Sequence, residues 1–151
     1  MLSVYLAGEI HTNWREEIAE GAQNFNVMFT SPVTDHEASD DCGVKIMGSE
    51  ELKFWHDHKG AKLNAIRTRK YIEEADVVVV RFGDKYKQWN AAFEAGYAAA
   101  LGKSIIVMHG GRPSACIKRG RRFGIGSCRN LPTGCGDTRV HRKRYIASLA
   151  G

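Results

Sequence analysis

Residues 76–108 read DVVVVRFGDKYKQWNAAFEAGYAAALGKSIIVM, and this segment indicates the fold class most clearly. It opens with four consecutive valines, residues 77–80, a β-branched run that is typical of a parallel strand covered on both faces. A loop follows, then a predicted helix over residues 91–101, and Gly102 stands where a glycine commonly ends a helix. The apolar run at residues 104–108 predicts the next strand. Strand, helix and strand in this order predict a parallel pair joined by a right-handed crossover.

The residues before this stretch extend the same alternation. Residues 3–7 and 27–30 each read as a short strand. Residues 14–25 carry apolar side chains at helical spacing and follow Asn13, a residue type that caps helices. Residues 62–75 predict a further helix. The whole pattern predicts an α/β fold, a flavodoxin-like (Rossmann-like) parallel sheet of four to five strands flanked by helices.

Ligands of such sheets bind beyond the carboxyl ends of the strands. Here the loops at that edge are expected at residues 8–13, 31–42 and 82–90. Residues 34–42 are polar and acidic, so we expect a long functional loop there instead of a packed element.

Composition fits one cytoplasmic domain. The length of 151 residues and a hydrophobic content of 43% allow a buried core. No apolar run approaches the roughly 20 residues of a membrane span, and the N-terminus has no signal-peptide pattern. We therefore expect a protein of the cytosol with no membrane partner.

The composition changes abruptly at residue 110. Residues 110–144 contain ten Lys or Arg residues and one Asp, although the net charge of the whole chain is +5. This basic, Gly-, Arg- and Cys-rich tail has neither strand nor helix periodicity until residues 145–149, and its three cysteines form no CxxC pair and read as free thiols. Basic charge suits nucleic acid, but the aromatic residues of a stacking surface are missing, which argues against it. We expect residues 1–109 to form the α/β domain and residues 110–151 to be a tail translated in a shifted reading frame or disordered.

Glu94 is the strongest catalytic candidate. It lies in the early turns of the helix that follows the valine strand, where helix N-terminal amides favour a carboxylate. The small residues around it, such as Ala91 and Gly96, let a ligand approach the helix. The alternative is a solvent-facing glutamate, the usual fate of this residue type.

Two strings in the sequence resemble the YtoQ family. They are YLAGEIH with NWREE, in residues 5–17, and FGDKYKQWN, residues 82–90. That family is itself similar to the nucleoside 2-deoxyribosyltransferases, and the resemblance covers roughly residues 2–109. It implies a nucleoside or nucleotide ligand, no cofactor, and a homodimer, because relatives of this kind complete their sites across subunits.

The resemblance also implies roles for two residues. Glu94 matches a glutamate nucleophile that attacks the anomeric carbon and displaces a base, and Tyr5 matches a tyrosine that holds the nucleophile or the sugar. Two other positions depart from the superfamily, which has aspartates where this chain has Thr68 and Gln88. Base departure normally needs a proton donor, and His11 or Asp35 is a candidate for that role.

Further residues are expected at the pocket rim. Gly8 and His11 belong to the first loop, and Asn90 lies beside Trp89 before the Glu94 helix. Arg15 suits a phosphate, or it pairs with a carboxylate of its own helix.

Trp14 and Trp89 stack on a base or fill the core, and core filling is more common for Trp. His56 and His58 resemble a metal pair, but nothing fixes a tetrahedral set, so we expect no metal site. An enzyme that breaks or transfers an N-glycosidic bond is the preferred interpretation. A non-catalytic nucleotide-binding or sensor module is the alternative, because the two aspartates are missing.

Overall fold

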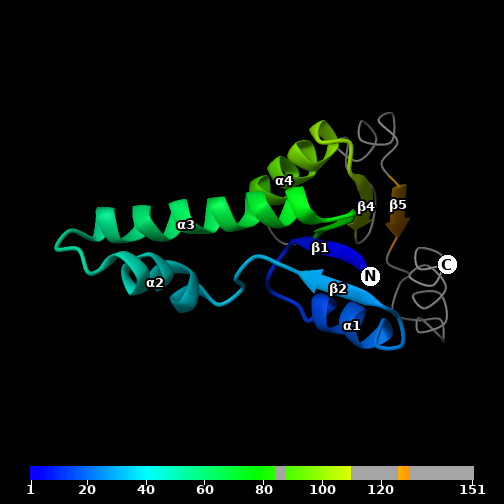
Figure 1. Ribbon diagram of the computed structural model, residues 1–151, viewed down its shortest axis with the longest axis horizontal. Coiled ribbons are helices and arrows are strands. Elements are labelled where there is room, and N and C mark those ends of the chain that lie inside the picture. The colour runs from blue at the N-terminus through cyan, green and yellow to red at the C-terminus, as the bar shows by residue number, and fades with distance from the viewer. Residues whose placement is uncertain (84–87, 110–125, 130–151) are drawn as a thin grey trace.

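The computed structural model describes residues 1–83, 88–109 and 126–129 (Figure 1). Its strands are β1 (Leu2–Gly8), β2 (Val27–Thr30), β3 (Val77–Phe82), β4 (Ser104–His109) and β5 (Gly126–Arg129). Its helices are α1 (Trp14–Gly21), α2 (His36–Met47), α3 (Lys53–Glu74) and α4 (Trp89–Ala100). The five strands form one parallel sheet in the order β2-β1-β3-β4-β5. This is the flavodoxin-like order, so the predicted fold class is confirmed.

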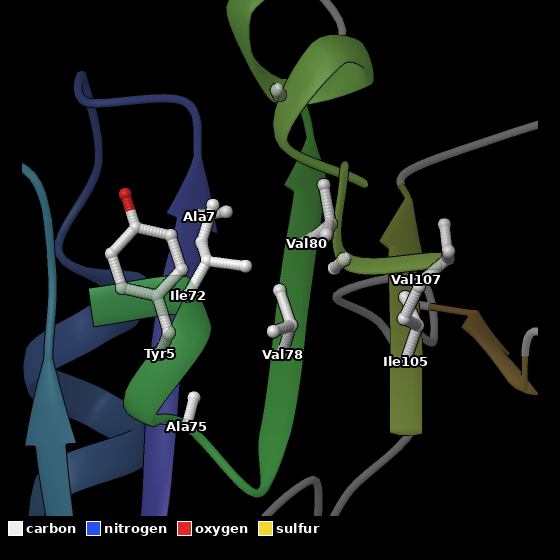
Figure 2. Close-up of a cluster of buried hydrophobic side chains, with 10 residues drawn as sticks. Tyr5, Ala7, Ile72, Ala75, Val78, Val80, Ile105 and Val107 are labelled. Atoms are coloured by element: carbon white, nitrogen blue, oxygen red, sulfur yellow. The ribbon is translucent and has the colours of Figure 1, made fainter. Parts of the chain in front are cut away.

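Each face of the sheet has its own hydrophobic core, as the alternation of side chains along a strand requires. Figure 2 shows the face on which Tyr5, Val78 and Val80 pack with Ile72 of α3. On the opposite face Val4, Leu6, Val77 and Val79 pack against Trp14 and Ile18 of α1. The valine run is therefore buried on both faces, as its composition predicted.

A long loop was expected at residues 34–42, but α2 begins at His36 and includes residues 36–42, so that prediction was wrong. Asp35 begins the helix as its N-cap, and its Oδ1 accepts a hydrogen bond from the Ala38 N–H at 2.7 Å. The helix then packs along α3, and this hairpin projects from the sheet (Figure 1). The polar composition of residues 34–42 did not indicate a helix. Helix α2 is polar because it packs mainly on α3 and contributes little to the main core.

Other boundaries also differ from the sequence-based expectations. Helix α1 ends at Gly21, before residue 25, and its N-cap residue Asn13 makes no side-chain capping hydrogen bond. Strand β5 pairs with β4 from within the tail in which no strand was expected. The rest of residues 110–151 lies outside the described residues, and the division of the chain at residue 110 stays a prediction. Among the described residues, no helix has both the length and the hydropathy to cross a bilayer.

Candidate active site

Tyr5 and Glu94 meet on the face of the sheet that α3 and α4 cover. Tyr5 is on β1 and is completely buried, and Glu94 is partly buried in the second turn of α4. The Tyr5 hydroxyl donates a hydrogen bond to Glu94 Oε2 at 3.4 Å. In Figure 2 the same hydroxyl points toward the carboxyl ends of β1 and β3. The carboxylate therefore lies where parallel α/β folds bind ligands.

Burial sets the protonation of this pair. It raises the pKa of Glu94 to about 7, although the Tyr5 hydrogen bond and the positive charge of Arg15 act in the opposite direction. Burial, followed by the negative charge of Glu94, also raises the pKa of Tyr5 far above its usual value. Tyr5 thus stays a neutral donor at any physiological pH, and Glu94 exchanges its proton near neutrality.

Thr68 joins the pair from α3. A hydrogen bond between the Thr68 side chain and the Tyr5 hydroxyl lowers the pKa of the tyrosine, as a donor to that oxygen does. Thr68 therefore acts on the tyrosine whose hydroxyl donates to Glu94. A neutral threonine fits here because the tyrosine oxygen needs a donor, which an ionised aspartate cannot provide.

Arg15 reaches the same neighbourhood from α1, but its donors are engaged by the backbone. Its guanidinium donates to the carbonyls of Leu6, Glu9 and Gly8 at 3.1, 2.7 and 3.0 Å. Strand β2 ends opposite Tyr5, so the Leu6 and Gly8 carbonyls have no strand partner on that side. Arg15 fills this gap, is only 7% exposed, and lies 4.5 Å above the Trp14 ring.

Sequence reasoning missed Glu9 as a site residue. Its carboxylate is 5% exposed and accepts hydrogen bonds from the N–H groups of His11 and Thr12 at 2.8 and 3.2 Å and from the Thr12 hydroxyl. Its Oε1 lies 3.1 Å from Arg81 Nε. Burial pushes the pKa of Glu9 up, but these hydrogen bonds and the Arg81 charge outweigh burial and hold it below its usual range. A glutamate directly after Gly8 at a strand end was the available signal.

Gly8 allows β1 and β3 to approach closely at the site. It has a φ of 122°, a conformation that other residues rarely adopt, and a Cβ at this position would lie 2.1 Å from the Arg81 carbonyl oxygen. Gly8, which was predicted to line the pocket rim, is therefore also needed for the backbone conformation at the end of β1.

The remaining rim candidates lie at the same sheet edge with different exposure. Gln88 Oε1 accepts a hydrogen bond from Gly83 N–H at 2.8 Å, which ties the two ends of the β3–α4 loop together. Trp89 is 74% exposed, and Asn90 and His11 are exposed. Residues 84–87 of this loop lie outside the described residues.

Trp14 and Asp35 were predicted to contact the ligand, but the structure shows other roles for both side chains. Trp14 is 2% exposed in the core, and its Nε1 donates to the Glu9 carbonyl at 2.9 Å, so it has the core-filling role that was the alternative to base stacking. Asp35 is exposed and caps α2. Neither observation places these two side chains beside Glu94, and their roles as ligand contacts stay predictions.

A depression of about 560 Å³ lies between α2 and α3, and its lining is mainly acidic. Within it, His56 Nε2 is 3.2 Å from Asp41, and His56 Nδ1 is 3.3 Å from Asp57. Asp57 precedes Thr68 on α3 by a helix length of roughly 16 Å, so this depression is separate from the Tyr5–Glu94 pair. Across residues 1–83, 88–109 and 126–129, no group of three or more His, Cys, Asp or Glu side chains is arranged to hold a metal ion.

The family described as nucleoside 2-deoxyribosyltransferase YtoQ matches residues 5–120, which is more than half of the chain. The chain belongs to this YtoQ family. An uncharacterized protein YtoQ of Bacillus subtilis (strain 168) is 45% identical over 107 residues, which cover 70% of this chain and 72% of that protein. The predicted family membership is confirmed, and the match extends beyond residue 109, where the resemblance was expected to stop.

Two solved structures resemble this YtoQ-family chain. Clostridium botulinum CMP N-glycosidase, BcmB, has a TM-score of 0.50 at 15% identity and covers 97% of both chains. A 2-deoxyribosyltransferase from Bacillus psychrosaccharolyticus has a TM-score of 0.45 at 19% identity and covers 71% of this chain and 72% of its own. At this level of identity the first likeness supports the shared fold.

Proposed function

We propose that the chain cleaves or transfers the N-glycosidic bond of a nucleoside or nucleotide, with Glu94 as nucleophile. The observation that carries this proposal is the hydrogen bond from Tyr5 to Glu94 at 3.4 Å, at the ligand-binding edge of a parallel sheet. Membership of a family described as nucleoside 2-deoxyribosyltransferase adds the substrate class. A partly buried carboxylate with a pKa of about 7 in such a place is a typical catalytic group.

The proposed reaction has two displacements at the anomeric carbon. The ionised Glu94 carboxylate forms a bond to that carbon while the N-glycosidic bond breaks, and the base leaves with the electron pair and takes a proton. Water or a second base then attacks the same carbon and releases Glu94. Tyr5 orients the carboxylate. Attack by water gives hydrolysis, and attack by a second base gives transfer.

His11 is the preferred proton donor for the leaving base. It is exposed in the loop after β1, and the hydrogen bond from its N–H to Glu9 fixes the backbone of that loop. Asp35 was the other candidate, but its carboxylate is bound to the first turn of α2. His11→Gln should therefore reduce base release more than Asp35→Asn does.

A second candidate function is a binding module without turnover. The observation that favours it is the neutral pair Thr68 and Gln88, whose hydrogen bonds go to Tyr5 and to the Gly83 N–H. Neither side chain can accept or donate a proton as the aspartates of the superfamily would at these two positions.

Base release from a panel of nucleosides and nucleotides, followed by liquid chromatography, distinguishes the two functions. We expect wild-type turnover and a loss of at least about 1,000-fold in Glu94→Gln, because removing a nucleophile removes the covalent route. Glu74→Gln is the matched control, since Glu74 is an exposed glutamate paired with Lys70 on α3. Binding without base release in the wild type would favour the module, and equal turnover in Glu94→Gln would refute the assigned nucleophile.

A further inference from the structure

Glu9 lies where three segments meet at the carboxyl edge of the sheet. Its Oε2 accepts hydrogen bonds from the N–H groups of His11 and Thr12 in the loop after β1, and its Oε1 accepts one from the Thr12 hydroxyl. The same Oε1 is 3.1 Å from Arg81 Nε on β3. The stem of Glu9 lies beside Gly83, because a Cβ on this glycine would be 3.1 Å from Glu9 Cγ. One buried side chain therefore joins the loop after β1 to the end of β3 and to the start of the loop that leads to α4.

These contacts suit an ionised carboxylate. All four partners are donors, namely two N–H groups, one hydroxyl and one guanidinium, so both oxygens of Glu9 act as acceptors. Burial raises the pKa of Glu9, but the hydrogen bonds from Thr12 and His11 and the Arg81 charge hold it below its usual range. A glutamine would keep the shape of the side chain, but its NH₂ group would face donors at one of the two positions. Glu9→Gln should therefore break part of this set of contacts.

His11 is the residue of this loop to which the proposed reaction gives a chemical role. Proton transfer to the leaving base requires that the donor lie within hydrogen-bond reach of it. His11 is exposed, and an exposed loop is mobile unless its backbone is fixed. Glu9 fixes this backbone at residue 11 and again at residue 12, at donor–acceptor distances of 2.8 and 3.2 Å.

We infer that Glu9 is a positioning residue, which holds the loop after β1 so that His11 stays at the carboxyl edge of the sheet and can protonate the leaving base. Glu9 is only 5% exposed, so it acts through the loop and not on the substrate. This inference rests on the proposed function for the role of His11. The hold of Glu9 on the loop can be tested without any turnover.

The first experiment is a double-mutant cycle between Glu9 and His11, with base release from the best substrate of the panel as the readout. We expect Glu9→Gln alone to lower kcat/KM at least about 10-fold, a part of what a positioned general acid contributes. In the His11→Gln background the same change should have little further effect, because the group that it positions is already absent. Glu16→Gln is the matched control, since it removes an exposed carboxylate from the first turn of α1. Losses that multiply in the double variant would overturn the inference, because they would show general damage to the site.

Thr12 allows a milder change to the same contacts. Thr12→Val removes the hydroxyl that donates to Glu9 at nearly constant volume, and Thr12→Ser keeps that hydroxyl. Thr12 is exposed, so neither change disturbs the core. We expect Thr12→Val to lower kcat/KM in the same direction as Glu9→Gln and by a smaller factor, and Thr12→Ser to restore it. A serine variant as impaired as the valine variant would contradict the role of this hydrogen bond.

The last experiment measures amide hydrogen exchange at His11 and Thr12 by NMR and needs no substrate. Exchange at both amides should be at least about 10-fold faster in Glu9→Gln than in the wild type or in Glu16→Gln, because a donor that loses its acceptor opens more often. Unchanged exchange would overturn the hold of Glu9 on the loop. A wild type without base release would refute the proposed function, and faster exchange in Glu9→Gln would then still support that hold.

Discussion

Glu94 has a pKa in the neutral range because burial disfavours its charge more than Tyr5 and Arg15 stabilise it. A carboxyl group with this pKa is present in both its protonated and its ionised form at neutral pH. The sequence placed Glu94 at the start of a helix after a strand, which was enough to select it. The sequence did not show the burial that shifts its pKa, because burial depends on how α3 and α4 pack over the sheet.

The raised pKa makes the stability difference between Glu94→Gln and the wild type depend on pH. The folded-state pKa of about 7 is above the ordinary value of 4.5, so the folded protein holds this proton more tightly than the unfolded chain. The contribution of Glu94 to stability is therefore full below about pH 4.5 and is lost as the pH rises through about 7. We expect Glu94→Gln to gain about 2 kcal/mol relative to the wild type between pH 5 and pH 8, measured by urea denaturation. With Glu74→Gln as control, a difference that does not change with pH would contradict this prediction.

Removing the Tyr5 hydroxyl should raise the pKa of Glu94 further. That hydroxyl donates to the carboxylate, and a hydrogen bond to the charged form lowers the pKa. Carboxyl carbon NMR of labelled glutamate should show Glu94 titrating near pH 7 in the wild type and about one pH unit higher in Tyr5→Phe. Tyr71→Phe is the control, because the Tyr71 ring centroid is 6.3 Å from that of Tyr5. An unchanged Glu94 titration in Tyr5→Phe would show that the hydrogen bond does not form in solution.

At the scale of elements, the sheet and the second half of α3 could be predicted, whereas α2 and the first part of α3 could not. Strands β1, β3 and β4 are continuous apolar runs because both faces of each are covered, and such runs are visible in sequence. Helix α2 has few apolar residues because it packs mainly on α3. The Glu9 and Arg15 contacts were also hidden, because they depend on β2 ending opposite Tyr5 and on the path of the loop after β1.

Two glycines explain how α2 and α3 pack so closely. A Cβ on Gly43 would lie 2.5 Å from Lys59 Cβ, and a Cβ on Gly60 would lie 2.7 Å from the Asp40 carbonyl oxygen. We expect Gly60→Ala to separate the helices and cost about 2 kcal/mol, measured as a loss of stability in urea. Gly96→Ala in α4 is the control, since nothing lies within 4 Å of a Cβ there, and it should be neutral or stabilising by about 0.5–1 kcal/mol. A Gly60→Ala protein as stable as the wild type would contradict the close contact.

At the scale of the whole molecule, the α2–α3 hairpin projects from the sheet (Figure 1) and carries exposed apolar side chains. Five large ones lie around the turn between the two helices and are each about half exposed or more: Ile46, Met47, Leu52, Phe54 and Trp55. Large exposed apolar side chains that gather in one part of a fold are typical of protein interfaces. The expected homodimer therefore has a candidate contact surface.

We expect light scattering after size-exclusion chromatography to give the mass of a dimer for the wild type. The double variant Phe54→Ser with Trp55→Ser should shift it toward the monomer, because it removes the two largest apolar side chains of the hairpin turn. Exchanging Trp89, an exposed aromatic residue of α4, for Ser provides the control. A monomeric wild type at micromolar concentration, or a double variant that remains dimeric, would contradict this contact surface.

If Glu94 is the nucleophile, as we propose, its carboxylate forms a covalent bond to the sugar during the reaction. The most direct measurement is intact-protein mass spectrometry after brief reaction with a nucleoside that releases its base, followed by peptide mapping. We expect a mass increase equal to one bound sugar residue, located at Glu94 and absent from Glu94→Gln. A bound sugar at another residue, or base release with the same adduct in Glu94→Gln, would contradict it.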